Sequence, residues 1–154
     1  MRLLYPAILE RDDNGTLLIT CPVLPEVTTF AEGEADWQEH ARDAIEEAIA
    51  ARMNSWADVP LPEGDGIFGH DGPLQRRFVE LSLQTDLKLM LFRSCKQAGV
   101  SRADLARRLS WHREQVDRLF RLDHASRIDQ IDAAIRAIGM TFAVDIVDPK
   151  IEAA

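Results

Sequence analysis

The sequence has little cysteine, few aromatic residues and no long apolar run. Only two of the 154 residues are cysteines, Cys21 and Cys95, and their spacing fits neither a metal motif nor a disulfide framework. No segment approaches the ~18 consecutive apolar residues that a membrane-spanning helix needs. The opening stretch, MRLLYPAILERDD, lacks the basic start, long apolar core and cleavage site of a secretory signal. These absences predict a cytoplasmic protein with free thiols, no membrane span, no bound metal and no cofactor.

What the sequence does contain is charge, and the two signs are separated along the chain. The formal net charge is −8, with 17 acidic and 6 basic residues in 1–87 but 4 acidic and 10 basic residues in 88–127. Seven arginines lie within Ser101–Arg127 alone. Opposite signs in adjoining regions indicate two partners, a polyanion for the basic block and a basic molecule for the acidic block. Ordinary solvated charge is the alternative interpretation of the acidic part.

The first third of the chain predicts a small antiparallel sheet followed by one helix. Apolar runs at 3–9 and 17–21 flank Asn14-Gly15, a strong hairpin signal, and a β-branched run at 27–30 supplies a third strand. Because Pro6 cannot donate to a strand ladder, the first strand is expected to lie at an edge or a bulge at that residue. In EADWQEHARDAIEEAIAARM, apolar residues recur every three or four positions, which predicts a helix with an acidic outer face.

Residues 54–75 show no apolar periodicity, and their three prolines and four glycines are typical of a linker or long loop. The stretch RFVEL that follows is compatible with a fourth strand, and the sequence does not decide whether it returns to the first sheet. We therefore divide the chain into a sheet-and-helix domain at 1–56, a linker at 57–77 and a helical domain at 78–154.

The helical domain has the spacing of a helix-turn-helix. A first helix ends at Gly99, a second begins with Ser101 as its N-cap, and a third begins near His112 after a three-residue turn. A further helix follows, and alternation over 141–148 predicts a short strand whose partner is a dimer mate or the first sheet. The predicted fold class is α+β: an antiparallel meander with one helix, then an all-α helix-turn-helix domain with a C-terminal strand.

The third helix of this domain is the candidate DNA-recognition helix. Once its apolar residues are buried, Arg113, Glu114 and Arg118 point outward and can pair with base edges in a major groove. Arg102 and Arg127 suit phosphates. A surface bundle whose arginines only confer solubility is the alternative. The predicted DNA-binding residues are Ser101, Arg102, His112, Arg113, Glu114, Gln115, Asp117, Arg118, Arg121, Ser126 and Arg127.

Two segments resemble, in order, the two parts of a known protein family. YPAILERDDNGTLLITCPVLPEVTTFAEGEADWQEHARDAIEEAI resembles the N-terminal domain of HicB antitoxins, with a Tyr-Pro opening strand, a Gly-containing hairpin, a strand ending in Pro-x-Leu-Pro and an acidic helix. AGVSRADLARRLSWHREQVDRLFRLDHASRIDQIDAAIRAIGM resembles the Xre/Cro-type helix-turn-helix that many HicB proteins carry behind it. The chain departs from the family in reading PVLPE for PDLPG, and in having Ser110 and Arg102 where Gly and Gln are usual.

The resemblance implies the antitoxin of a type II toxin–antitoxin pair, without enzymatic activity. Its N-terminal domain would be a truncated RNase H-like fold that covers HicA, a small basic mRNA interferase. Its C-terminal domain would form a homodimer or higher homo-oligomer and repress its own operon at a palindromic operator. We expect toxin contacts on the acidic helix face and the first hairpin, at Glu10, Asp12, Asp13, Glu39, Asp43, Glu46 and Glu47.

Two other functions are weighed against this one. A stand-alone transcriptional regulator would use the helix-turn-helix without a toxin partner. A metal-dependent nuclease would need converging carboxylates, for which Glu10, Asp12 and Asp13 are the candidates. Acidic residues at a hairpin tip are ordinary turn chemistry, so the nuclease is disfavoured and no catalytic residue is expected.

Overall fold

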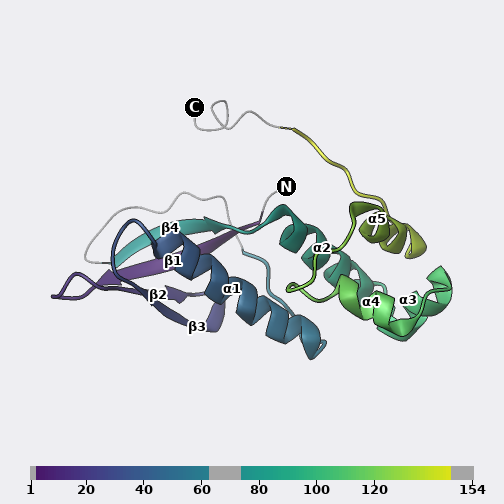
Figure 1. The fold of residues 1–154 in the computed structure, drawn as a ribbon, viewed down its shortest axis with the longest axis horizontal. Helices are drawn as coiled ribbons and strands as arrows, with labels where there is room; N and C mark the ends of the chain where they lie inside the picture. The colour runs from purple at the N-terminus through teal and green to yellow at the C-terminus, as the bar shows by residue number, and fades with distance from the viewer. Residues whose placement is uncertain (1–2, 63–73, 147–154) are drawn as a thin grey trace.

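The computed structural model describes residues 3–62 and 74–146, which form four strands and five helices. In Figure 1 the sheet and its helix make one half of an elongated molecule and the remaining helices make the other. The mixed α+β fold class is confirmed. In chain order the elements are β1 (Leu4–Arg11), β2 (Leu17–Cys21), β3 (Leu24–Ala31), α1 (Trp37–Asn54), β4 (Leu74–Glu80), α2 (Leu83–Gln97), α3 (Arg102–Leu109), α4 (Arg113–Leu119) and α5 (Ile128–Ala137).

The sheet is antiparallel throughout, with the strand order β3-β2-β1-β4. The predicted hairpin joins β1 to β2: the backbone N–H of Asp12 donates to the carbonyl of Thr16 at 2.9 Å. Gly15 completes the turn with φ +89°, a conformation that glycine adopts without steric cost. The three-stranded meander expected from the sequence is therefore present, and a fourth strand extends it.

The fourth strand corrects the expected linker. Residues 74–77 were expected in the linker and 78–80 in the helical domain, but together they form β4, which pairs along β1 from Leu4 opposite Glu80 to Glu10 opposite Leu74. The stretch RFVEL had indicated a fourth strand, but its partner β1 is far away in the sequence, so local patterns did not decide the pairing. Residues 63–73 of the expected linker lie outside the described residues.

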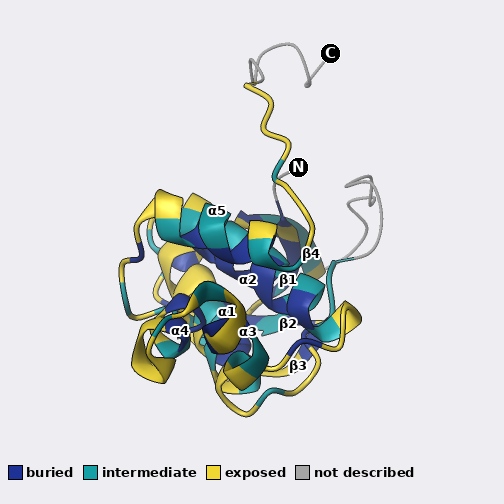
Figure 2. Ribbon diagram, turned by 90° about the vertical axis from the view of Figure 1, so that its right-hand side faces the viewer, coloured by how far each residue is buried: buried dark blue, intermediate teal, exposed yellow. Residues whose placement is uncertain are grey.

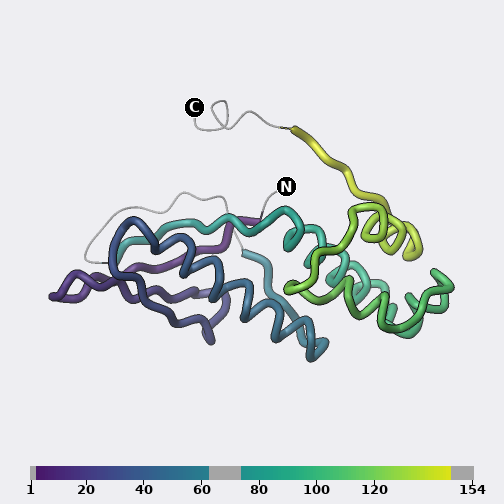
Figure 3. The backbone as a smooth tube through the Cα atoms, in the orientation of Figure 1, coloured from purple at the N-terminus to yellow at the C-terminus, as the bar shows by residue number. Residues whose placement is uncertain are grey.

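At Pro6 β1 is locally an edge, as expected, although the strand is central from Ile8 to Arg11. β1 is a central strand, between β2 and β4, as the backbone trace in Figure 3 also shows. Its pairing with β2 runs from Ile8 to Arg11, so Pro6 lies beyond that ladder and faces only Phe78 of β4. The missing N–H therefore costs no bond on the β2 side, and the proline is tolerated within a central strand.

Helix α1 covers one face of the sheet. Its apolar stripe, including Ile45 and Ile49, is fully buried against strand residues such as Tyr5 and Ile19, which are also fully buried. Burying a side chain of this size stabilises the fold by about 1.5–3 kcal/mol. The stripe predicted from the spacing of apolar residues is thus the face that packs on the sheet.

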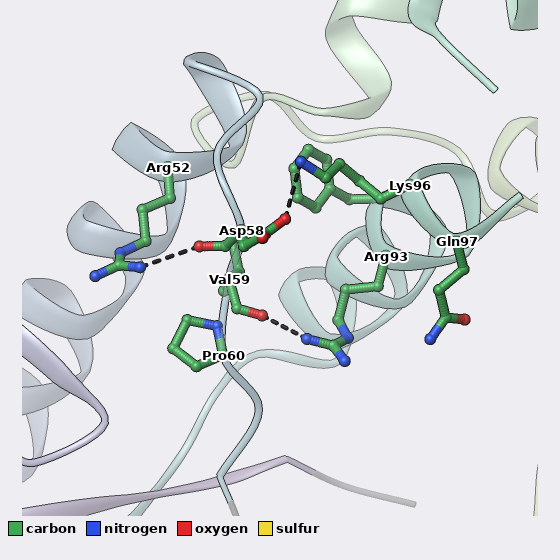
Figure 4. A pocket seen from close by; sticks show the side chains of 8 residues that line it. Arg52, Asp58, Val59, Pro60, Arg93, Lys96 and Gln97 are labelled. Atoms are coloured by element: carbon green, nitrogen blue, oxygen red, sulfur yellow. Dashed lines mark hydrogen bonds and ion pairs between the residues drawn. The ribbon is translucent and has the colours of Figure 1, made fainter. Parts of the chain in front are cut away.

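The segment after α1 is packed between the two halves, although residues 57–62 were expected to belong to a linker. Trp56 stacks edge-on against Phe92 of α2 and Phe120 after α4, with ring centroids 4.9 and 5.3 Å away. Lys96 pairs with Asp58 at 2.9 Å and Arg93 donates to the carbonyl of Val59 at 2.5 Å. Figure 4 shows the contacts of Lys96 with Asp58 and of Arg93 with Val59 beside a small pocket. The two halves therefore share one continuous core.

The expected C-terminal strand at 141–148 is not formed over 141–146, and 147–148 lie outside the described residues. Val144 and Ile146 are 76% and 100% exposed, because no described strand lies beside them. The helices in the described part of the chain are too short or too polar to cross a membrane.

Candidate nucleic-acid and partner interfaces

The helix-turn-helix is built from a capped α3 and a short α4. The hydroxyl of Ser101 accepts from the backbone N–H of Asp104 at 3.1 Å, and the Asp104 carboxylate accepts from the N–H of Ser101 at 3.0 Å. This reciprocal pair satisfies two amide groups at the start of α3. The hydrogen bonds from Ser101 hold the pKa of Asp104 below its ordinary value. Leu105 and Val116 are fully buried and pin the two helices together.

The turn between α3 and α4 uses a residue that few turns of this kind tolerate. Ser110 has φ +54° and ψ +38°, the left-handed conformation that favours glycine. A side chain there costs about 1 kcal/mol relative to glycine. His112 then caps α4, and its backbone N–H donates to the side-chain oxygen of Gln115 at 2.9 Å. His112 and Gln115 thus hold the start of the candidate recognition helix.

The outward face of α4 carries exposed charged side chains. Val116, Leu119 and Phe120 are buried, and Arg113 and Arg118 are exposed. Among the described residues, neither guanidinium forms a hydrogen bond or an ion pair, and Glu114 beside them is also exposed. Figure 2 shows exposed residues on the outward side of this region. The two exposed arginines make this face the candidate nucleic-acid interface.

Arg102, a predicted phosphate contact, has partners within the chain. Its guanidinium donates to the carbonyl of Met53 at 2.8 Å and of Asn54 at 3.3 Å, at the C-terminal end of α1. It also stacks over the Trp56 ring at 4.9 Å and pairs with Asp117 at 3.8 Å. The side chain is only 23% exposed. The carbonyls that end a helix attract a cation, so Arg102, which also pairs with Asp117 of α4, joins the helical half to α1.

Three further predicted DNA contacts are engaged within the chain. Ser126 is buried, and its hydroxyl donates to the carbonyl of Arg118 at 3.3 Å. Arg121 pairs with Asp123, and Arg127 pairs with Asp129. Both arginines remain exposed, but each local carboxylate offsets much of the positive charge that a phosphate would meet.

Lys88 of α2 is a supporting residue that sequence reasoning missed. It is fully buried, and its ammonium donates to the carbonyls of Arg118, Arg121 and His124 at 3.2, 2.5 and 2.5 Å. Burial lowers the pKa of Lys88 to about 8. Its three donors close the C-terminal end of α4 and the loop after it. A lysine inside the apolar run of α2 is the signal that could have revealed it.

The predicted toxin-binding carboxylates fall into separate places. Glu39, Asp43 and Glu47 lie on the exposed side of α1. Glu46 is half-buried, and it accepts from the Thr85 hydroxyl at 2.9 Å, so it is part of the junction with α2. Glu10 lies on the opposite side of the sheet from α1, because the preceding residue in β1 is buried under that helix and neighbours alternate. A flat partner surface could therefore not contact Glu10 and the exposed carboxylates of α1 at the same time.

The hairpin carboxylates show turn chemistry. Asp12 accepts from the backbone N–H of Asn14 at 2.9 Å, and both Asp12 and Asp13 are exposed. Within the described ranges no cluster of His, Cys, Asp or Glu could hold a metal ion. Cys21 and Cys95 are buried free thiols, and burial raises the pKa of both.

Comparison with known proteins points to one family. Residues 4–90 match the model of a family described as HicB_like antitoxin of bacterial toxin-antitoxin system. Antitoxin HicB of Escherichia coli strain K12 is 29% identical over 143 residues, which cover 93% of this chain and 99% of that protein. Antitoxin HicB 1 of Photorhabdus laumondii is 25% identical over 142 residues, 92% of this chain and 86% of that protein. Antitoxin HicB of Pseudomonas fluorescens Pf0-1 is 27% identical over 140 residues, 91% and 92% of the two chains.

Proposed function

This chain belongs to the family of HicB-like antitoxins of bacterial toxin–antitoxin systems, and from that premise we propose that it neutralises a HicA-type mRNA interferase and represses its own operon. The observation that carries the proposal is the extent of the likeness to named antitoxins, which runs through the sheet, α1 and the helix-turn-helix. The sheet and α1 would serve the toxin, and α2–α5 would serve the operator. Both would act in the cytoplasm.

The charge of the first half supports the toxin-binding part of the proposal. Residues 1–87 carry 17 acidic and 6 basic residues, which suits a small basic ribonuclease. Complementary charge raises the association rate and discriminates against acidic partners. Like its relatives, which are named antitoxins and not enzymes, the chain would act by binding. It would need no cofactor or metal.

The exposed arginines of α4 support the operator-binding part. A homodimer would present two copies of α4 to half-sites about one DNA turn, ~34 Å, apart, and so would read a palindrome. Exposed apolar side chains at Ile128, Met140 and Val144 offer surface for that second copy, or for a higher homo-oligomer.

The toxin part is tested by co-expressing the chain with the small basic protein encoded next to it. We expect growth to be restored and the two proteins to purify together. Failure to find or bind any such neighbour, with operator binding intact, would favour the stand-alone regulator, which the helix-turn-helix by itself supports.

The operator part is tested by measuring binding to the DNA upstream of the gene in rising salt. Affinity should fall steeply, because each phosphate contact releases a counterion. Binding that is equal on unrelated DNA would remove the repressor role. A magnesium-dependent nuclease assay, repeated with Asp13→Ala, checks the non-enzymatic role; activity that depends on Asp13 would contradict it.

A further inference from the structure

The sheet has a second face, away from α1, that carries apolar side chains. The strand register places Phe30, Leu18, Glu10 and Leu74 side by side across β3, β2, β1 and β4. Their neighbours in sequence, such as Leu9 and Leu17, are buried on the α1 side, so this row points the other way. Phe30 is 59% exposed and Leu74 is 50% exposed. One row therefore holds three apolar side chains and a central carboxylate.

The neighbouring rows of cross-strand pairs on this face also carry apolar side chains. Ile8 lies opposite both Thr20 and Arg76, and Pro6 lies opposite Phe78. At the far end Leu4, 39% exposed, is paired with Glu80. Of the described helices only α1 packs broadly on the strands, and it lies on the other side. The outer sheet face, defined by Phe30, Leu18, Glu10, Leu74, Ile8 and Leu4, is thus an apolar strip without a covering helix.

The charges of the outer sheet face are mainly negative. Two carboxylates lie on this face, Glu10 within the strip and Glu80 at its end. Arg76 is the cation among the paired strand residues of the same face. The hairpin with Asp12 and Asp13 extends from the same end of the sheet as Glu10. A partner that fits would present an apolar patch surrounded by lysine or arginine.

The exposed side of α1 is different, because it offers charge without apolar anchors. Its exposed residues include Glu39, Asp43 and Glu47, and all of the exposed large apolar side chains in the described chain lie outside α1. Stable interfaces depend on a few desolvated apolar or aromatic anchors, whereas charges at the rim mainly set the association rate. The α1 side therefore has the means to steer a basic partner but not to hold it.

We propose that the basic toxin docks on the outer sheet face. Phe30 and Leu74 would be the apolar anchors of this interface, and Glu10 would form an ion pair with a basic residue of the toxin. This rests on the proposed antitoxin function and deepens it by naming the surface. The proposed docking surface is therefore one of mixed apolar and acidic character, and not the acidic side of α1 that the sequence predicted. The carboxylates of α1 then contribute only long-range attraction.

The test compares toxin affinity for matched variants of the full-length protein. We expect Phe30→Ser with Leu74→Ser to weaken binding by at least ~30-fold, since central anchors contribute most of an interface's affinity. Glu10→Lys should weaken it by at least ~10-fold and slow association. Glu39→Lys with Glu47→Lys, on the rival surface, should change affinity by less than ~5-fold. Leu83→Ser removes a side chain of α2 that is equally exposed, 59%, and should leave affinity unchanged.

Operator binding and thermal unfolding are measured for each variant to report whether it folds. Both should stay close to the wild type for the strand variants, because the altered side chains are exposed and distant from α4. If the α1 variants lose the toxin while Phe30→Ser with Leu74→Ser retains it, the proposal is overturned and the antitoxin function stands. If the wild-type protein captures no toxin, the proposed function itself fails. If the Phe30 and Leu74 substitutions convert the toxin-free protein to a smaller oligomer, the outer sheet face is an interface with a second copy of this chain. That result also overturns the proposal.

Discussion

Arg102 and the pair Arg113 and Arg118 come from the same basic block but have different surroundings. Arg102, at the start of α3, lies against the last carbonyls of α1 and over the Trp56 ring. Arg113 and Arg118, one helix later, are exposed and without a partner among the described residues. The comparison teaches that the net charge of a segment overstates the charge that it offers to DNA. Part of the basic block joins the two halves of the protein, and part is paired with nearby aspartates.

The largest predicted effect sharpens this contrast on the exposed side. Arg113→Ala with Arg118→Ala should weaken operator binding by about 10²–10³-fold, because each bidentate contact with a base is worth about 1–3 kcal/mol. Gel-shift titration on the chain's own promoter measures it. Arg136→Ala on α5, where the arginine is paired with Asp132, is the control and should change binding little. Equal losses from both variants would mean that only overall charge matters.

The next prediction concerns the support beneath α4. Lys88→Met should lower the free energy of unfolding by about 2–3 kcal/mol, because three carbonyls at the end of α4 would lose their buried donor. Urea titration followed by circular dichroism measures this. Lys96→Met, which removes a partly exposed lysine from the same helix, is the control and should cost less. An unchanged stability for Lys88→Met would show that water satisfies the carbonyls.

A smaller effect is expected on the inward side of the comparison. Arg102→Met should lower the free energy of unfolding by about 1–2 kcal/mol, through loss of its bonds to α1 and its stacking on Trp56. Operator affinity of the folded variant should stay within ~3-fold of the wild type. Arg107→Met, an exposed arginine of the same helix, should leave both measurements nearly unchanged. A large loss of affinity in Arg102→Met without loss of stability would return Arg102 to the DNA contacts.

The smallest effect is a pH dependence at the cap of α3. Because Ser101 holds the pKa of Asp104 below its ordinary value, the cap stabilises the fold above about pH 4. That contribution is lost as pH falls through the lowered folded-state pKa. The melting temperature should therefore fall less between pH 5 and about pH 2 in Asp104→Asn than in the wild type. Parallel curves would assign the acid sensitivity to other carboxylates.

Local signals were sufficient for much of the fold. Asn14-Gly15 predicted the hairpin, Ser101 the helix cap and the apolar spacing of α1 its buried stripe, because each depends on residues that are neighbours in the chain. Pro6 likewise predicted a local edge, and β1 has no β2 partner at that position, but the proline did not reveal that β1 is central from Ile8 to Arg11. The residues predicted to contact toxin and operator remain predictions as binding sites.

Short-range patterns in the sequence were enough to predict the first three strands, the five helices, the separation of charge and the resemblance to the antitoxin family. The tertiary structure alone decided that β4 completes the sheet, that Arg102 faces inward and that Glu10 and Glu39 lie on opposite sides. The physical reason is that these outcomes depend on contacts between residues far apart in the chain. Such contacts exist only after the sheet, α1 and the helical half have packed into one core.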